Sequence, residues 1–163
     1  MRSIAEITKK MIAFSEGNLH DINHFLKVWA FARTIGISEG LDEEAQFILE
    51  VSALIHDIAC PLCRKKYGCT DGKLQEKEGA PLAAEFLADA GLTAGEIEKV
   101  SYIVGHHHTY SNVESIEHQI LLEADYLVNA DESGYSRRNI ENFRDLVFRT
   151  RTGKELLGSV YGV

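Results

Sequence analysis

The amino-acid sequence predicts an all-α fold in a single domain. Only two prolines occur among 163 residues, and few stretches alternate apolar and polar side chains as half-buried strands do. Apolar residues instead recur at helical spacing along most of the chain, without an internal repeat, a low-complexity segment or a linker. A chain of this length can bury a proper hydrophobic core, so we expect one domain over residues 1–163.

Apolar periodicity, capping residues and glycines define the expected helices in order. Gly17 suits a C-terminal cap for the first helix, and Gly36 and Gly40 are expected to end the second. The carboxylate of Asp42 can cap the amides that begin the third. The expected helices cover residues 4–17, 21–34, 42–57, 79–91, 93–105 (opened by a Thr93–Glu96 capping box), 116–128 and, for the C-terminal helices, 136–160.

The apolar periodicity is lost between residues 60 and 77, where we expect a loop. Pro61, Gly68, Asp71 and Gly72 all lie in this stretch. A loop of that length inside a compact domain is usually functional. We therefore expect residues 60–77 to contribute to a binding or catalytic site.

Charge and hydropathy narrow the classes of partner. The formal net charge of −8 argues against a nucleic-acid polymer or an anionic membrane surface as the main partner. A small phosphorylated substrate stays compatible with it, because such a substrate needs only a local basic or metal-bearing pocket. The N-terminal residues lack the apolar core of a signal peptide, and we expect that no stretch reaches the roughly 20 apolar residues of a membrane span. We expect no membrane partner.

Cys60, Cys63 and Cys69 are the three cysteines of the chain. Their odd number and close spacing are unlike a secreted disulfide framework, so we expect a reducing, cytoplasmic compartment. A structural zinc site needs a fourth ligand, which the neighbouring sequence does not offer. The Cys60–Cys63 spacing also lacks the context of a redox motif. We interpret the three cysteines as small loop residues.

His56 and Asp57 follow an apolar run directly, at the end of an expected helix. Burying such an ionisable pair costs several kcal/mol unless the charges are paired or bound to a cation. One interpretation is a helix end whose polar residues face water. The other is that both side chains ligate one metal ion.

His24 and Asp125 show the same anomaly on other helices. Asp125 lies one helical turn from Leu121 and Val128, and His24 is adjacent to Phe25, so both point towards apolar faces. A lone buried histidine or aspartate is often a satisfied hydrogen-bonding residue of the core. Several such residues on helices whose apolar faces must meet in one core favour the metal interpretation.

The set His24, His56, Asp57 and Asp125 offers nitrogen and oxygen ligands without a thiolate. Such a set suits a divalent Mn, Fe, Ni, Co or Zn ion and leaves coordination positions open for water and substrate. A metal held in this way lowers the pKa of bound water and acts as a Lewis acid on a phosphoryl oxygen.

The order of these four residues resembles the H…HD…D signature of the HD-domain metal-dependent phosphohydrolase superfamily. Residues 21–28, 53–58 and 120–125 each resemble the local context of one motif, and the similarity spans about residues 19–128. The resemblance implies an all-helical fold of the HD-domain type. Residues 66–68, 75–79 and 106–110 are similar to a subgroup of small, largely uncharacterised bacterial HD-domain proteins.

The resemblance implies hydrolysis of a phosphate ester of a small metabolite, nucleotides included, by metal-activated water. Asp57 is then expected to orient or deprotonate the attacking water as well as to ligate the metal. Lys27, three residues beyond His24, and His107 are expected to stabilise charge on the phosphoryl oxygens. Further positive charge is concentrated in residues 64–73.

A second metal is the main point that the sequence leaves open. Dinuclear HD enzymes usually place a histidine before the helix that follows the loop, where this chain has Gln75, Glu76 and Glu78. We expect one firmly bound ion, and Glu76 with His106 or His107 are the candidates for a second ion or a phosphate contact. The alternative for histidines 106–108 is a solvated helix terminus.

Two rival functions also remain at this stage. One is a regulatory or ligand-binding protein that keeps the metal without turnover. The other is di-iron oxygenase chemistry, because some HD relatives with two irons cleave carbon bonds. A monomer and a homodimer are equally compatible with the sequence.

Overall fold

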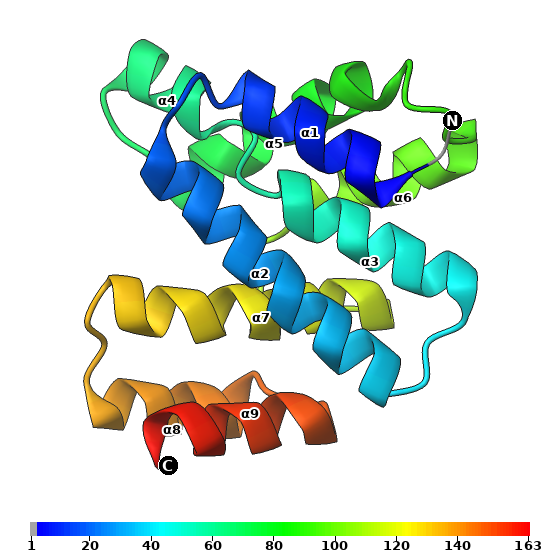
Figure 1. Ribbon diagram of the computed structural model, residues 1–163. Helices are drawn as coiled ribbons and strands as arrows, with labels where there is room; N and C mark the ends of the chain where they lie inside the picture. The colour runs from blue at the N-terminus through cyan, green and yellow to red at the C-terminus, as the bar shows by residue number, and fades with distance from the viewer. Residues whose placement is uncertain (1–2) are drawn as a thin grey trace.

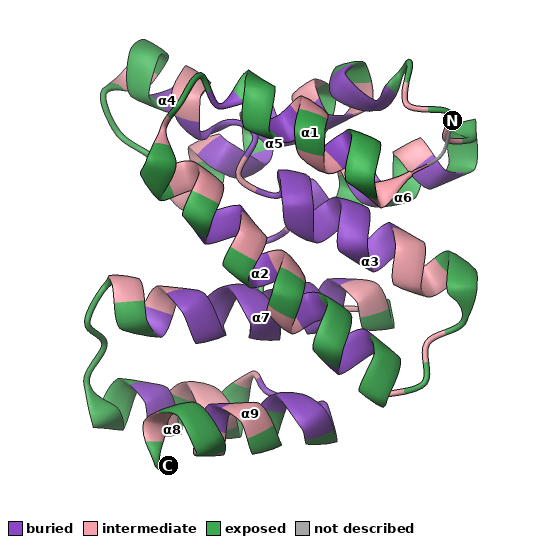
Figure 2. Ribbon diagram, viewed as in Figure 1, coloured by how far each residue is buried: buried purple, intermediate pink, exposed green. Residues whose placement is uncertain are grey.

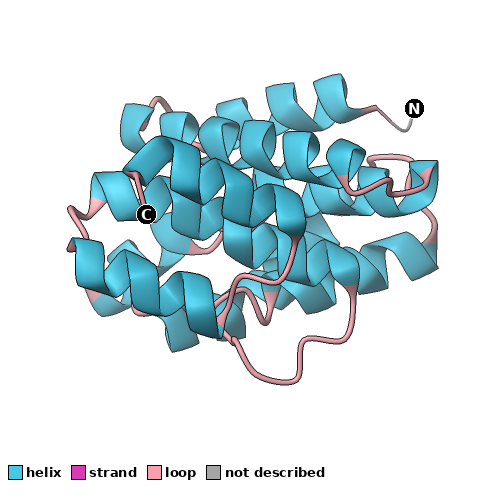
Figure 3. Cartoon of the chain, turned by 90° about the horizontal axis from the view of Figure 1, so that it is seen from below, coloured by secondary structure: helices cyan, strands magenta, loops and turns pink. Residues whose placement is uncertain are grey.

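Nine helices make up the part of the chain that the structure describes, residues 3–163, and this range contains no strand (Figures 1 and 3). The computed structural model therefore confirms the predicted all-α fold. The expected domain over residues 1–163 also includes Met1 and Arg2, which lie outside the described residues. The helices are α1 (Ile4–Phe14), α2 (Leu19–Ser38), α3 (Glu43–Ile55), α4 (Cys60–Tyr67), α5 (Gly72–Leu87), α6 (Ala94–Val104), α7 (Ile116–Glu132), α8 (Arg137–Leu146) and α9 (Arg151–Tyr161).

Short polar side chains begin eight of these helices. Each accepts a hydrogen bond from a backbone N–H inside the first turn, which satisfies one of the donors that a helix start leaves unpaired. The expected roles of Asp42 and of the Thr93–Glu96 capping box are confirmed. The capping residues are Ser3, Asn18, Asp42, Asp71, Thr93, Ser115, Ser136 and Thr150.

Helices α3 and α7 form the centre of the molecule. Every residue from 48 to 55 in α3 and from 118 to 128 in α7 is buried, which Figure 2 shows as long purple stretches of ribbon. Helix α2 crosses α7 and packs on both central helices. Helices α8 and α9 lie below α7 in Figure 1, on the side away from α3. Because every face of these stretches is covered, their polar side chains must find partners inside the protein.

The stretch Glu43–Tyr67 is long and apolar enough to cross a membrane by length and composition, so the expectation that no stretch reaches this measure is wrong. It contains α3, a turn and α4. Its most apolar 18-residue window is 72% buried among the other helices. Packing in the protein core accounts for its apolar character.

The predicted loop over residues 60–77 is also wrong, because α4 and the first part of α5 occupy most of it. Pro61 lies in the first turn of α4, where its missing N–H costs no hydrogen bond. Gly68 ends that helix in the left-handed conformation at a φ of 72°, and Asp71 caps α5. These residues mark helix boundaries here, and only a short turn separates the two helices.

Helix α4 and the first part of α5 were predicted as a loop because their buried faces carry few apolar side chains. Helix α4 buries Cys60 and Cys63, and the beginning of α5 buries Gln75 and Glu76. Polar residues on an inward face cancel the apolar periodicity on which a sequence-based helix prediction depends. Cys60 and Cys63 are therefore helical residues, and only Cys69 lies in the turn.

Gly36 lies inside α2, which continues to Ser38, so the expected helix end at residue 34 is wrong. A Cβ at Gly36 would lie 2.3 Å from Gln46 Oε1 and 2.8 Å from Leu49 Cδ2. Glycine at this position thus lets α2 and α3 approach closely. Gly40, with a φ of 78°, is the residue that turns the chain towards α3.

Glu123 joins the C-terminal helices to the core. Its buried carboxylate on α7 accepts hydrogen bonds from Gln119 Nε2 at 2.7 Å and from the backbone N–H groups of Arg149 at 2.7 Å and Thr150 at 3.0 Å. The chain before α9 is therefore fixed to α7. Glycine at position 153 leaves room for this carboxylate, since a Cβ there would lie 2.0 Å from Glu123 Oε2.

Replacing Glu123 by alanine is expected to lower the free energy of unfolding by about 3 kcal/mol, because several buried donors lose their shared acceptor. The matched control is Glu155→Ala on the exposed face of α9, where the expected change is below about 0.5 kcal/mol. Urea denaturation measures both. Equal stability of the two variants would contradict the role given to Glu123.

Candidate metal centre

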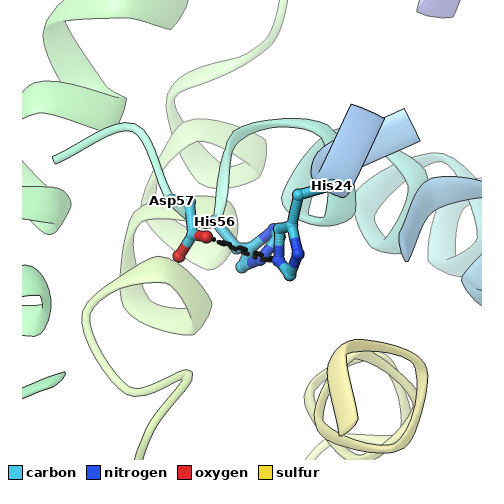
Figure 4. Close-up of side chains that lie close together, drawn as sticks. All are labelled: His24, His56 and Asp57. Atoms are coloured by element: carbon cyan, nitrogen blue, oxygen red, sulfur yellow. Dashed lines mark hydrogen bonds and ion pairs between the residues drawn. The ribbon is translucent and has the colours of Figure 1, made fainter. Parts of the chain in front are cut away.

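The four predicted ligands converge where α2, α3 and α7 meet. His24 comes from α2, His56 and Asp57 follow the end of α3, and Asp125 lies in α7. Figure 4 shows the two imidazoles and the Asp57 carboxylate pointing towards one another. His24 Nε2 lies 3.2 Å from His56 Nε2, 3.1 Å from Asp125 Oδ1 and 3.4 Å from Asp57 Oδ2. His56 Nε2 lies 3.4 Å from Asp125 Oδ1 and 3.5 Å from Asp57 Oδ2.

These distances fit one divalent ion. Nitrogen and oxygen ligands bound about 2.1 Å from a metal lie about 3.0 Å apart at right angles and about 3.4 Å apart at tetrahedral angles. The five distances between the donor atoms, from 3.1 to 3.5 Å, fall close to this range. His24, His56 and Asp57 are thus a geometrically suitable metal cluster, and Asp125 supplies a fourth donor atom.

The hydrogen bonds of the two histidines prepare them as ligands. His24 Nδ1 lies 2.7 Å from Glu132 Oε2, and His56 Nδ1 lies 2.8 Å from the carbonyl oxygen of Ala53. Both partners are acceptors, so each Nδ1 carries the proton and donates it. In the neutral imidazole the Nε2 lone pair is then left for the centre of the cluster, as in metal sites whose ligands are oriented by outer hydrogen bonds.

The charges of the cluster stabilise one another strongly. Burial disfavours ionised Asp57 and Asp125, but the adjacent imidazoles outweigh it and hold both carboxyl pKa values below their usual range. Burial likewise opposes a charge on His24, but Asp125, Asp57 and Glu132 together raise its pKa to about 9. Without a metal, His24 is therefore protonated at neutral pH. Metal binding must displace that proton, so it is favoured as the pH rises.

A second group of candidate ligands shares Asp57. Its Oδ1 lies 3.3 Å from His107 Nε2, and ligand atoms of Asp57, His107 and His108 all lie within 4.8 Å of one another. His107 Nδ1 donates to the carbonyl of Val104 at 2.7 Å, which leaves Nε2 for a ligand. Among the described residues, the buried Nε2 atoms of His107 and His108 have no aligned hydrogen-bond partner. Buried polar atoms of this kind call for a bound ion or water.

Glu76 and His106 do not belong to that second group. Glu76 pairs with Lys73 Nζ at 3.0 Å and accepts hydrogen bonds from Thr109 Oγ1 at 2.7 Å and the His108 N–H at 3.0 Å. His106 instead donates to the carbonyl of Tyr102 at 2.7 Å and stacks on the Tyr102 ring. The structure thus brings His107 to Asp57, and His108 takes the place that the sequence prediction gave to Glu76 or His106.

Lys27 lies on α2 near the cluster, but its ammonium group pairs with the carboxylate of Glu132. Its Nζ lies 2.6 Å from Glu132 Oε1, whose other oxygen accepts from His24. The cavity of about 240 Å³ over the metal cluster is lined by Arg64, and Lys27 lines a different surface hollow. The structure does not bring Lys27 to the cavity where a substrate phosphate would lie.

Sequence reasoning missed Glu132, and it named His108 and Arg64 only as members of the triple histidine and of a group of basic residues. Glu132 lies two helical turns after Asp125, so the shared face of α7 was a usable signal. His108 was hidden among three consecutive histidines, because only the chain path after α6 decides which of them turns inward. Arg64 was counted as one of several basic residues, since α4 was expected to be a loop.

Cys60 lines the cavity beside Asp57. Burial, with Asp57 and Asp21 nearby, raises the pKa of its thiol well above the ordinary value, so the sulfur stays protonated at neutral pH. A protonated thiol is a poor nucleophile and a poor metal ligand. No cysteine takes part in the candidate metal clusters found among residues 3–163.

Comparison with known proteins agrees with this geometry. A family model described as "HD domain" matches residues 21–130, a range that begins just before His24 and ends just after Asp125. A solved structure described as a predicted HD superfamily hydrolase, from an uncultured Thermotogales bacterium, is similar with a TM-score of 0.67 and 24% sequence identity. That match covers 99% of this chain and 85% of the other. No curated protein matches the chain.

Protein purified without chelators is expected to contain a divalent transition metal, measured by plasma mass spectrometry. Asp125→Ala should lose most of this metal, because the variant removes one carboxylate of the cluster. Asp131→Ala, on the exposed side of the same helix, should keep it. Chelation should lower the melting temperature of the parent protein and leave that of Asp125→Ala nearly unchanged. The same metal content in both variants would contradict the site.

Replacing Glu132 by glutamine is expected to weaken metal binding about 10- to 100-fold, because the charge that orients the His24 imidazole is removed. Competition with a fluorescent zinc chelator measures the affinity. Asp131→Asn makes the same chemical change at the preceding residue and should leave the affinity unaltered. An unchanged affinity in Glu132→Gln would show that His24 does not depend on this contact.

Proposed function

The chain belongs to the HD-domain family, and we propose on that premise that it is a metal-dependent phosphohydrolase acting on a phosphate ester of a small metabolite, nucleotides included. The observation that carries this proposal is the four-residue cluster of His24, His56, Asp57 and Asp125, three of which line a cavity of about 240 Å³. The similar Thermotogales protein is itself described as a predicted hydrolase, which supports a hydrolytic role.

A divalent ion bound here would supply an activated water and a Lewis acid for a phosphoryl oxygen. His24, His56, Asp57 and Asp125 would hold it. Three of the four lie in the cavity wall, so the cluster is accessible to a substrate. The side chain of Asp57 is 26% exposed, more than that of His24 at 6% or Asp125 at 8%. Asp57 is therefore the carboxylate best placed to orient the attacking water and accept its proton.

Arg64 is the residue we assign to the substrate phosphate. Among the described residues that line the cavity, it is the one arginine, and no lysine lines it. Asp21 accepts from both of its terminal nitrogens, at 2.8 and 2.6 Å, which fixes the planar guanidinium at the wall. The guanidinium has further N–H donors beyond this pair, and these can donate to a phosphate oxygen. We also assign His107 to charge stabilisation on the same oxygens; its side chain is fully buried next to Asp57 and does not itself line the cavity.

A second ion is the finer part of the proposal. Asp57, His107 and His108 would hold it, because their ligand atoms lie within 4.8 Å of one another. The Nε2 atoms of His107 and His108 are buried and have no aligned hydrogen-bond partner among the described residues, which supports this assignment. The same arrangement keeps di-iron oxygenase chemistry as the second candidate function, and a metal-binding protein without turnover as the third.

We also propose a cytoplasmic location and a small-molecule substrate. Three free cysteines, two of them buried, suit a reducing compartment. The net charge of −8 disfavours nucleic-acid polymers and anionic membranes as partners.

The test is phosphate release from nucleotides, sugar phosphates and cyclic dinucleotides in the presence of Mn, Co, Ni or Mg. We expect turnover with at least one class, and its loss in Asp57→Asn. Arg64→Met should raise KM at least tenfold with a smaller effect on kcat, because it removes a contact to the bound phosphate. Lys65→Met makes the same charge change on the exposed side of α4 and should behave like the parent protein.

Two outcomes would contradict the proposal. Metal-loaded protein without phosphate release from any of these classes would favour the binding function. Oxygen-dependent turnover with two redox-active irons per chain would favour the oxygenase.

A further inference from the structure

A second cavity, of about 260 Å³, opens beside the metal centre between α7, α8 and the chain that precedes α7. We call it the aromatic cleft and define it by the residues that only this cavity has: Tyr110, Tyr126, Tyr135, Asn139 and Phe143. Four of these five side chains are aromatic rings. The metal-site cavity, by contrast, is lined mostly by polar and charged groups.

The two cavities share three lining residues at the metal centre. His108, Asp125 and Asn129 line both of them. Each cavity alone is smaller than the roughly 300–1,000 Å³ of ordinary ligand sites, whereas the two together fall within that range. A ligand of ordinary size at the metal centre would therefore extend into the aromatic cleft.

The rings of the cleft form a fixed floor and an exposed rim. Tyr126 stacks on Phe143 with ring centroids 3.7 Å apart and planes 7° from parallel, and the Tyr126 hydroxyl donates to Asn139 Oδ1. Tyr110 meets the Phe143 ring edge-on at 5.1 Å, and Tyr135 lies 5.6 Å from Tyr126. Tyr110 and Tyr135 are nevertheless 44% and 40% exposed, so both rings offer surface to a ligand.

The charged side chains of the cleft lie at its end next to the metal centre. Asp125 and His108, which belong to the metal centre, are the titrating acidic and imidazole groups of the described lining, and the other lining residues are aromatic rings and amides. The cleft thus suits an uncharged, flat group rather than a second phosphate.

We propose that the aromatic cleft binds a planar aromatic ring of the same phosphate ester whose phosphoryl group lies at the metal centre. The inference rests on the proposed function and adds its specificity: the substrate is a phosphate ester that carries an aromatic ring. Tyr110 and Tyr135 hold the ring by stacking, and the amides of Asn129 and Asn139 lie where its polar edge would be. Stacking on aromatic side chains tolerates different bases and contributes about tenfold or more in affinity per ring.

The test compares three phosphate monoesters that share the phosphoryl group: adenosine 5′-monophosphate, phenyl phosphate and ribose 5-phosphate. Binding is measured by ligand-observed NMR and, where hydrolysis occurs, by kcat/KM. The nucleotide should bind at least tenfold more tightly than ribose 5-phosphate, with saturation transfer strongest at its base protons. Phenyl phosphate shows whether a ring next to the phosphate suffices or whether the spacing of a nucleoside is needed.

Tyr110→Leu and Tyr135→Leu should each reduce the ratio of nucleotide to ribose 5-phosphate affinity at least fivefold, while Tyr110→Phe should retain it. Tyr102→Leu removes an exposed tyrosine outside the cleft and is the matched control. Using two positions keeps the test decisive if one leucine variant does not fold, which the melting temperature reports.

The outcomes separate this inference from the proposed function. Preferential binding of ring-bearing esters without phosphate release would support the cleft and contradict phosphohydrolysis. Phosphate release with equal kcat/KM for all three esters would support phosphohydrolysis and overturn the cleft. The cleft is also overturned if none of the three binds, or if the leucine variants keep the parent preference.

Discussion

The structure depends on two carboxylates, Asp57 and Asp125, that lie with two imidazoles where α2, α3 and α7 meet. Each imidazole Nε2 lies 3.1–3.5 Å from an oxygen of Asp57 and of Asp125, and such a group of charges inside a protein core is stabilised by a cation at its centre. In the protein without metal, the proton on His24 provides part of that charge. A divalent ion would provide it fully. Burial of these carboxylates between the central helices thus requires a positive charge at the site, and a bound metal ion supplies that charge.

The surroundings of the cluster are organised to keep the donors in place. Glu132 orients His24 on one side, and the carbonyl of Ala53 orients His56 on the other. Glu76 accepts from Thr109 and from the His108 N–H, which fixes the turn after α6 beside Asp57. A buried polar network of this kind holds the geometry only when every member is satisfied.

The sequence was sufficient for the all-α class and for bringing His24, His56, Asp57 and Asp125 into one proposed set, because isolated polar residues on apolar helix faces are visible in a single chain. It failed where the inward face is itself polar. Gln75 and Glu76 interrupt the apolar periodicity at the beginning of α5, so that part of the helix was predicted as a loop, together with α4. The directions of the three histidine side chains could not be predicted from the sequence either. Only the folded turn after α6 shows that His107 and His108 face Asp57 while His106 faces Tyr102.

The central claim is that one metal ion lies among the four donors. Anomalous X-ray diffraction from crystals of the protein as purified, recorded at the absorption edge of the metal found in it, tests this directly. The account predicts an anomalous peak within about 2.3 Å of His24 Nε2, His56 Nε2, Asp57 and Asp125 Oδ1. A peak elsewhere on the protein, or no peak between these four side chains, would contradict it.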